Sequence, residues 1–162
     1  MNKTAFAIEP GRQEILMTRE FDAPRDLVFE TMTDPDLLPR WWGPRSHTTR
    51  VDRMEVKFGG AWRYLVHDAD GQETAFRGAY HAVVAPGRLV TTFEWEGMPG
   101  HVGLVTTTLE EVGGKTRLTE LSLFPSVADR DMNISNGMEG GATETMDRLE
   151  ELLAKAEVAG KQ

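Results

Sequence analysis

Six segments rich in strand-forming residues follow one another between residues 47 and 124, and short glycine-containing turns separate them. Each segment is rich in Val, Thr, Phe, Tyr or Trp, the residue types that favour β-strands. Turns as short as Asp70-Gly71 and Gly113-Gly114 join antiparallel neighbours. The pattern predicts an antiparallel sheet with strands at 47–58, 61–68, 73–84, 88–96, 101–111 and 116–124, and a seventh strand from Gln13 to Phe21.

The end of the chain has a different period. Apolar or small residues recur at helix spacing at Met138, Ala142, Thr145, Leu149, Leu152 and Ala156. Asn136 with Glu139 is a candidate capping pair for this long helix, and Ser126 with Asp129 opens a shorter helix before it. One long helix is thus available to cover one face of a sheet of about seven strands. We expect a single α+β domain over residues 1–162, with its core at about 12–156 and a hollow between sheet and helix.

The segment from Phe21 to Pro44 predicts two short helices between the first two strands. Each helix has a proline near its start and an aspartate that can cap it, Asp22 before Pro24 and Asp34 before Pro35. Gly43 followed by Pro44 ends the second helix. The adjacent Trp41 and Trp42 cannot share one helix face, so we expect one ring inward and one at the surface, as a wall or lid.

Composition excludes several classes of protein. The 162 residues include no cysteine, which rules out disulfides and thiolate metal sites. A formal net charge of -8 and scattered basic residues argue against a nucleic-acid partner. No apolar run reaches the length of a signal peptide or a membrane span, so no membrane partner and a cytoplasmic location are expected.

Hairpin register predicts which side chains share a face of the sheet. The pairs expected across the turns at Asp70-Gly71 and Pro86-Gly87 are Tyr64 with Phe76, Trp62 with Gly78, Tyr80 with Phe93, and Gly78 with Trp95. This register gathers six aromatic side chains on one face and leaves open space at Gly78. The opposite face receives the charged or polar residues Arg63, Arg77, His81 and Glu94.

The aromatic face has two interpretations. Ordinary core packing is one, and the other is a binding cavity, because the helix segment from Gly140 to Thr143 is small where large rings stand opposite. Glycine inside a helix costs about 1 kcal/mol relative to alanine, so either close packing on the rings or space for a ligand is its expected reason. The expected cavity lining is Trp42, Trp62, Tyr64, Phe76, Tyr80, Phe93, Trp95, His101, Met138, Ala142 and Thr145, and Glu120 is a further polar candidate.

Catalytic and metal-binding patterns are not evident. The four histidines show no metal-ligand spacing, and no zinc motif, phosphate loop, dinucleotide fingerprint or GxSxG sequence occurs. We therefore expect no metal and no cofactor. His101 follows the Pro99-Gly100 turn, where an exposed turn residue and a general base or anion-binding group are both open interpretations. The acidic residues at 129–131 are interpreted as the start of a helix.

Several stretches together resemble a known superfamily: FDAPRDLVFETMTDPDLLPRWWGP, GGAWRY, ETAFRGAYHAVVAPGRLVTTFEWEGMPGH, TRLTELSLF and GMEGGATETMDRLEELL. They are similar to SRPBCC (START-like, helix-grip) proteins, and most of all to the branch related to the C-terminal domain of the heat shock protein 90 ATPase activator. The resemblance covers about Arg12 to Leu153. It implies a seven-stranded sheet that grips the C-terminal helix around a cavity.

The resemblance implies no single activity, because the superfamily includes lipid and hormone carriers as well as polyketide cyclases and aromatases. Our first hypothesis is binding of a small apolar or aromatic molecule. The second is a cyclase or aromatase that uses a tyrosine or His101 as acid or base. The third is a module that stimulates a chaperone ATPase, which we rank last because the activator's N-terminal chaperone-binding domain has no counterpart here. Pairing of two copies through the charged sheet face or an edge strand stays open.

Overall fold

The computed structural model describes residues 1–160, with side chains up to residue 156. One antiparallel sheet contains eight strands in the order β1-β2-β8-β7-β6-β5-β4-β3. The strands are β1 (Ala5–Ala7), β2 (Glu14–Phe21), β3 (Thr48–Met54), β4 (Ala61–His67), β5 (Glu73–Val84), β6 (Arg88–Trp95), β7 (Gly103–Val112) and β8 (Lys115–Leu123). The helices are α1 (Arg25–Thr33), η1 (Leu38–Arg40), α2 (Val127–Ser135) and α3 (Met138–Gly160), where η1 is a 3-10 turn.

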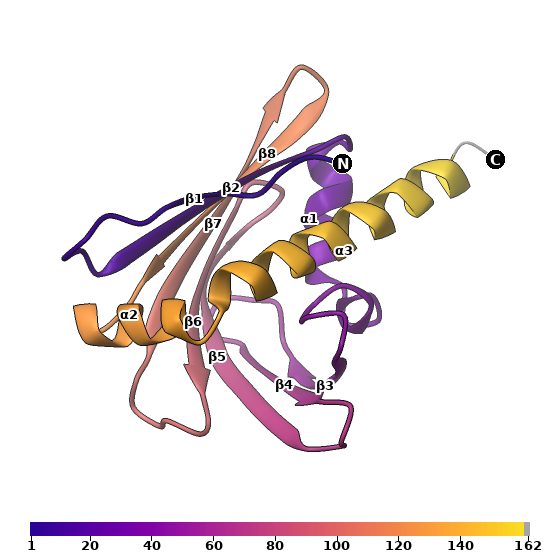
Figure 1. Ribbon diagram of the computed structural model, residues 1–162. Helices are drawn as coiled ribbons and strands as arrows, with labels where there is room; N and C mark the ends of the chain where they lie inside the picture. Colours follow the sequence, from indigo (N-terminus) through magenta and orange to yellow (C-terminus); the bar gives the residue numbers. More distant parts are fainter. Residues whose placement is uncertain (161–162) are drawn as a thin grey trace.

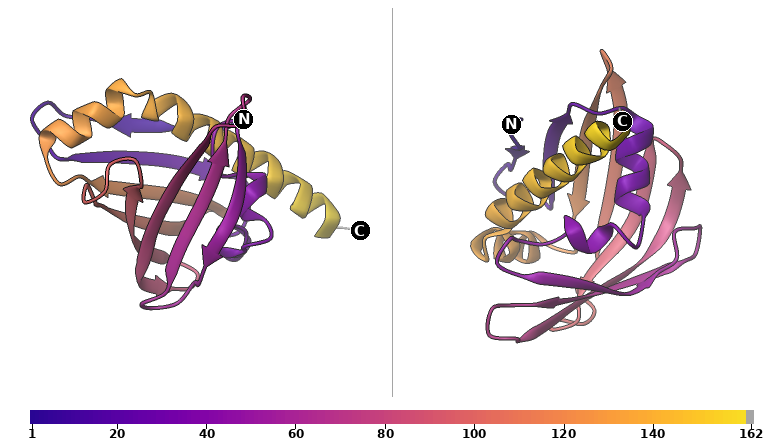
Figure 2. Two further views of the ribbon diagram at one scale, coloured as in Figure 1. Left: turned by 90° about the horizontal axis from the view of Figure 1, so that it is seen from below. Right: turned by 90° about the vertical axis from the view of Figure 1, so that its right-hand side faces the viewer.

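The sheet curves around α3, and α2 lies at the end of the sheet where α3 begins (Figures 1 and 2). The strand β2 and the strand β3 lie far apart in the sheet order, so the segment that carries α1 and η1 must pass from one side of the sheet to the other. This arrangement confirms the helix-grip α+β fold. The eighth strand, β1, was not expected. It has only three residues, which pair with β2 from Ala5 opposite Thr18 onward, and three residues are too few to show an alternating pattern in the sequence.

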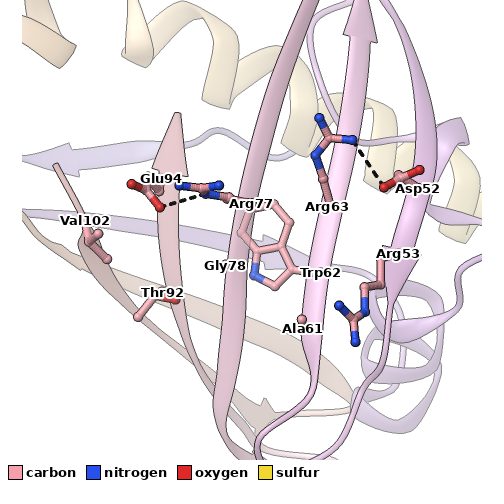
Figure 3. Close-up of a pocket in the computed structure, with 10 residues that line it drawn as sticks. All are labelled: Asp52, Arg53, Ala61, Trp62, Arg63, Arg77, Gly78, Thr92, Glu94 and Val102. Carbon is pink, nitrogen blue, oxygen red and sulfur yellow. Dashed lines mark hydrogen bonds and ion pairs between the residues drawn. The ribbon is translucent and has the colours of Figure 1, made fainter. Parts of the chain in front are cut away.

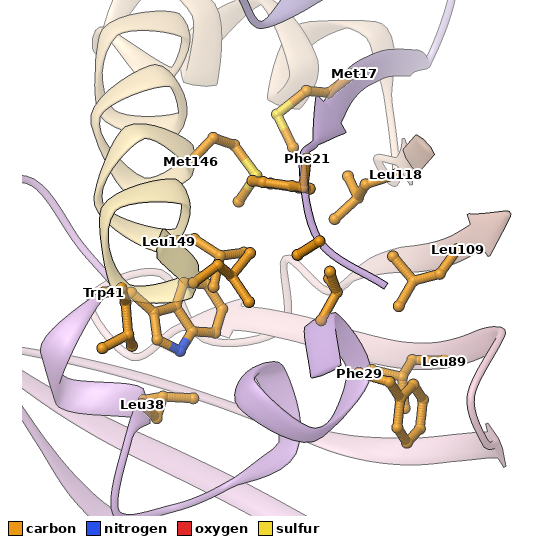
Figure 4. Packing of buried hydrophobic residues seen from close by; sticks show 14 of the residues in the cluster. Met17, Phe21, Phe29, Leu38, Trp41, Leu89, Leu109, Leu118, Met146 and Leu149 are labelled. Atoms are coloured by element: carbon orange, nitrogen blue, oxygen red, sulfur yellow. The ribbon is translucent and has the colours of Figure 1, made fainter. Parts of the chain in front are cut away.

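The hydrophobic core lies between the sheet and the middle of α3, from Met146 to Leu153 (Figure 4). Alternate residues of β2 point inward, and they end with Phe21, which is fully buried. Met146 and Leu149 of α3 pack into the same cluster, together with Leu38 and Trp41. Each such side chain contributes about 1.5–3 kcal/mol through burial. The middle of α3 is therefore the part that holds the helix in the grip.

Two arginines tie α3 to its surroundings. Arg19 on β2 is 2% exposed and donates to Asp147 at 2.8 Å, with Glu150 at 3.5 Å. Arg148 donates to the backbone carbonyl of Gly43 at 2.7 Å and so fixes the segment after η1 against the helix. Both sides of α3 are thus linked to parts of the chain more than a hundred residues away in sequence.

The ends of α1 and η1 differ in detail from the prediction. Pro24 is the N-cap of α1 and no side chain caps this helix, since Asp22 pairs with Lys115 at 3.2 Å instead. Asp34 accepts from the backbone N–H of Asp36 as expected, at 2.9 Å. The chain then forms only the 3-10 turn η1 in place of a second α-helix, because a proline within it cannot donate a helical hydrogen bond.

Gly43 and the cap of α2 agree with the prediction, whereas the start of α3 does not. Gly43 has the expected left-handed conformation, with φ of 96°. Ser126 caps α2 by accepting from the N–H of Asp129 at 3.0 Å, as expected. Asn136 closes α2 and does not open α3, since Gly137 with φ of 85° turns the chain between the two helices. The predicted capping pair of Asn136 with Glu139 was therefore wrong.

Candidate functional site

Five aromatic rings form one continuous cluster on the concave face of the sheet. Its members are Trp42 after η1, Trp62 and Tyr64 on β4, Phe76 on β5 and Phe93 on β6. Neighbouring ring centroids lie 4.6–5.9 Å apart, within the usual range for aromatic pairs. We call these five residues the aromatic wall.

The tryptophan pair was expected to present one ring at the surface. Trp41 is buried in the core, as predicted for the inward ring. Trp42 is half-buried and packs edge-on against Tyr64 at 5.1 Å and Phe76 at 5.5 Å. Trp42 is thus part of the aromatic wall, and the prediction of a surface ring was wrong because β4 and β5 supply partners for it.

The register of the first hairpin is as predicted, with Tyr64 opposite Phe76 and Trp62 opposite Gly78. The register of the second hairpin was wrong: Phe76 is opposite Trp95, and Tyr80 is opposite Thr91. An irregularity between Tyr80 and Ala82 changes the pairing. The difference is two residues, so the side chains still point to the predicted face.

Gly78 does not leave open space. A Cβ atom at this position would collide with the backbone carbonyl oxygen of Thr92 and would lie 2.5 Å from Nε1 of Trp62, so β6 and the indole ring together fill the room beside the glycine. The glycine is required for the approach of this ring to β5. The expectation of an empty volume at this point was wrong.

A pocket lies where the aromatic wall ends, and we call it the mouth pocket. It has a volume of about 80 Å³ and lies between the ends of β6 and β8, the β6–β7 turn and α2. Its lining is Phe93, Trp95, Met98, His101, Gly103, Phe124, Pro125, Asp129, Met132, Asn133 and Asn136. Phe93 belongs to both structures, so the pocket and the aromatic wall are continuous.

A hydrogen bond between a histidine and an aspartate forms the polar side of the mouth pocket. Nδ1 of His101 lies 2.8 Å from Oδ2 of Asp129. The histidine side chain is 49% exposed and the aspartate 14%. Asp129 is held in the first turn of α2 by its N–H bond to Ser126, and Asn133 donates to its backbone carbonyl at 2.9 Å. This arrangement places an oriented imidazole beside aromatic rings.

Trp95 forms one edge of the pocket and is 42% exposed. Its ring lies directly over Gly97, where a Cβ atom would lie 2.9 Å or less from three ring atoms. A side chain at residue 97 would collide with the ring, so the glycine allows the ring to lie at this place. A large apolar ring held at a pocket edge in contact with water is a common feature of binding sites.

The other predicted lining residues do not border the mouth pocket. Tyr80 is buried in the core, and burial raises the pKa of the Tyr64 hydroxyl, with a smaller influence from Tyr80. On α3, Met138, Ala142 and Thr145 are half-buried, and the Thr145 hydroxyl donates to the Gly141 carbonyl at 2.9 Å. A Cβ atom at Gly140 or Gly141 would meet nothing within 4 Å. Close packing on the rings is therefore not the reason for these glycines.

Glu120 lies on the concave face, in the same alternation as the buried Leu118. It stands between Met17 of β2 and Thr107 of β7. Burial raises the pKa of its carboxyl group to about 7 and is the only influence on that pKa, so no nearby charge or hydrogen bond offsets the cost of ionisation.

The convex face of the sheet carries a second, open hollow of about 410 Å³ (Figure 3). Arg63 binds Glu96 through two hydrogen bonds of 2.6 and 2.9 Å, and Arg77 binds Glu94 at 2.9 Å. These charged residues lie on the outer face, as predicted. Since both arginines already have a carboxylate partner, their charge is not available to a ligand in this hollow.

The sequence analysis did not identify Asp129 or Gly97, the glycine beneath the Trp95 ring, as site residues. The pattern from Ser126 to Asp129 correctly placed the aspartate in the first turn of a helix. Its contact with His101 joins residues 28 positions apart and comes from the fold, so only a prediction of how α2 packs could have found it.

The described residues contain no candidate for a metal centre and none for a membrane-spanning helix. Among the side chains that the structure describes, up to residue 156, no three His, Asp or Glu side chains converge as ligands for a metal ion. None of the helices described in the structure has both the length and the apolar character of a membrane span.

Solved structures share this architecture closely. A Rhodobacter sphaeroides protein matches with a TM-score of 0.87 and 24% sequence identity, over 94% of this chain and 99% of that one. An Arthrobacter aurescens protein has a TM-score of 0.86 and 25% identity, covering 93% and 91%. A Staphylococcus epidermidis protein has a TM-score of 0.79 and 29% identity, covering 93% and 94%.

Two sequence comparisons gave different results. None of the functionally curated proteins compared with this sequence matches it. The family described as "Activator of Hsp90 ATPase homolog 1-like protein" matches residues 22–154, which span α1 to α3 and include every residue of the aromatic wall and the mouth pocket. On this match and on the helix-grip fold, the chain belongs to the Activator of Hsp90 ATPase homolog 1-like family.

Proposed function

We propose that this protein binds a small apolar or aromatic molecule at the mouth of the grip. The observation that carries the proposal is Trp95, a half-exposed ring fixed over Gly97 at the edge of a pocket whose inner side, Phe93, belongs to the aromatic wall. A ligand ring at this place contacts both residues and loses its own contact with water.

The size of the mouth pocket defines how much of a ligand it encloses. Drug-sized ligands occupy pockets of about 300–1,000 Å³. The volume of about 80 Å³ found here suits one end of a molecule, such as a single ring. The rest of the ligand then lies over the edge formed by Trp95 or along the open side of α3 near Gly141.

An NMR titration with three compounds, 2-naphthol, flavone and palmitate, tests this proposal. We expect saturable binding of at least one aromatic compound. Trp95→Leu should weaken that binding about two- to twelvefold, because a ring contact is worth about 0.5–1.5 kcal/mol. Phe58→Leu is the matched control, since Phe58 is an exposed aromatic residue outside the site. No saturable binding of any of the three compounds would overturn the proposal.

A second candidate function, acid–base catalysis of the cyclase or aromatase type, is favoured by the His101–Asp129 pair. An imidazole held by a carboxylate can remove a proton from a carbon next to a carbonyl group. Exchange of the α-protons of 2-tetralone in D₂O, followed by NMR, tests this activity. His101→Gln should abolish any protein-dependent exchange and His67→Gln should retain it. Exchange no faster than in buffer alone would count against catalysis.

A further inference from the structure

The orientation of His101 defines what chemistry its free nitrogen presents to a ligand. An ionised carboxylate only accepts hydrogen bonds, so the 2.8 Å contact with Asp129 requires Nδ1 of His101 to donate. In the neutral imidazole the other nitrogen, Nε2, then carries a lone pair and no proton. Nε2 is therefore a hydrogen-bond acceptor.

The ring is held in this orientation from both sides. On the histidine side, the β6–β7 turn is closed by the N–H of Gly100, which donates to Oε2 of Glu94 at 2.6 Å. On the aspartate side, Ser126 and Asn133 hold Asp129 in the first turn of α2. Two separate elements thus present the acceptor at a pocket lined by Phe93 and Trp95.

The negative charge near the mouth pocket favours neutral ligands over anionic ones. Asp129 stands directly behind the imidazole, and the whole chain carries a net charge of -8, so an anionic ligand is repelled. A neutral ring with a hydroxyl group satisfies both the aromatic contacts and the free lone pair.

We propose that the mouth pocket recognises aromatic ligands that carry a phenol or enol hydroxyl, which donates its hydrogen bond to Nε2 of His101. The proposal rests on the ligand binding argued above and adds the chemical class of the ligand. Asp129 is the positioning residue, because it sets which nitrogen of His101 holds the proton.

Three probes of the same ring system test the chemistry: 2-naphthol, its methyl ether 2-methoxynaphthalene, and 2-naphthoate. We expect 2-naphthol to bind about tenfold more tightly than the ether, since the ether cannot donate, and 2-naphthoate to bind most weakly. Asp129→Asn should abolish or invert the preference, because an amide that donates to Nδ1 moves the proton of the neutral ring to Nε2. Glu73→Gln is the control, as it alters a similar pair with His67 away from the pocket, at 3.0 Å.

The outcomes separate this proposal from the more general one. If 2-naphthol and its ether bind equally well, recognition of a hydroxyl is wrong while ligand binding stands. If none of the three naphthalenes binds while flavone or palmitate does, recognition of a hydroxyl is wrong; if flavone and palmitate also fail to bind, ligand binding itself fails. The ¹⁵N chemical shifts of His101 give a second measurement that needs no variant. They should show a proton on Nδ1 in the neutral ring, and a proton on Nε2 would overturn the proposal even if Asp129→Asn failed to fold.

Discussion

Glu120 shows how a single residue can make the stability of this protein depend on pH. The ordinary pKa of a glutamate is 4.5, and burial on the concave face raises it to about 7. The folded protein therefore holds this proton more tightly than the unfolded chain does. Stability consequently falls as the pH rises from about 4.5 to about 7, and the cost then stays constant.

Glu120→Gln removes the ionisable group and keeps the shape of the side chain. We expect the variant to be more stable than the parent at pH 8, by an amount on the order of 3 kcal/mol, and to differ little at pH 4.5. Urea unfolding at both pH values measures this. Glu111→Gln, a change at an exposed carboxylate, is the control. An equal effect of Glu120→Gln at both pH values would show that the carboxyl group ionises freely in the folded state.

Among the elements, the helix α3 is divided into two parts. Its middle packs Leu149 and Leu153 into the core, whereas Gly140 and Gly141 near its start have open space around them. Sequence spacing predicted the helix and its apolar face. It could not tell whether the glycines serve close packing or leave room, because that depends on the distance between α3 and the sheet.

Gly141→Ala tests this description of α3. The added methyl group meets no neighbour within 4 Å, so we expect stabilisation by about 0.5–1 kcal/mol through helix propensity alone. Gly78→Ala is the contrasting variant, because its Cβ would collide with the backbone carbonyl of Thr92 and with the Trp62 ring, and it should destabilise by about 1–3 kcal/mol. Chemical denaturation measures both. Destabilisation by Gly141→Ala would mean that the start of α3 packs closely after all.

The hairpins of the sheet show where sequence reasoning succeeds for single elements and where it stops. The short turn at Asp70-Gly71 set the register of Tyr64 with Phe76 correctly. The second hairpin was misplaced by two residues: the pairs next to the turn, such as Ala82 with Val90, already lie one residue from the predicted register, and the irregularity between Tyr80 and Ala82 adds one more. Since a two-residue difference preserves the alternation, the aromatic face was still predicted correctly.

For the molecule as a whole, the order of elements was enough to predict the grip. The six hairpin-connected strands and one long helix allow few other arrangements, and the family match agrees with that fold. The position of the pocket was not predictable in the same way. It arises where the β6–β7 turn packs against the segment that runs from the end of β8 into α2, and this packing depends on tertiary contacts such as that of His101 with Asp129.

The proposed binding requires a ligand ring to enter the mouth pocket, although the outer hollow is the larger of the two at about 410 Å³ against about 80 Å³. Intermolecular NOEs between 2-naphthol and the isotope-labelled protein distinguish the two places. We predict NOEs from the naphthol ring to Phe93 and Trp95, with the hydroxyl end nearest His101. NOEs to Arg63, Arg77 or Thr92 on the outer face, without any to Phe93, would contradict binding in the mouth pocket.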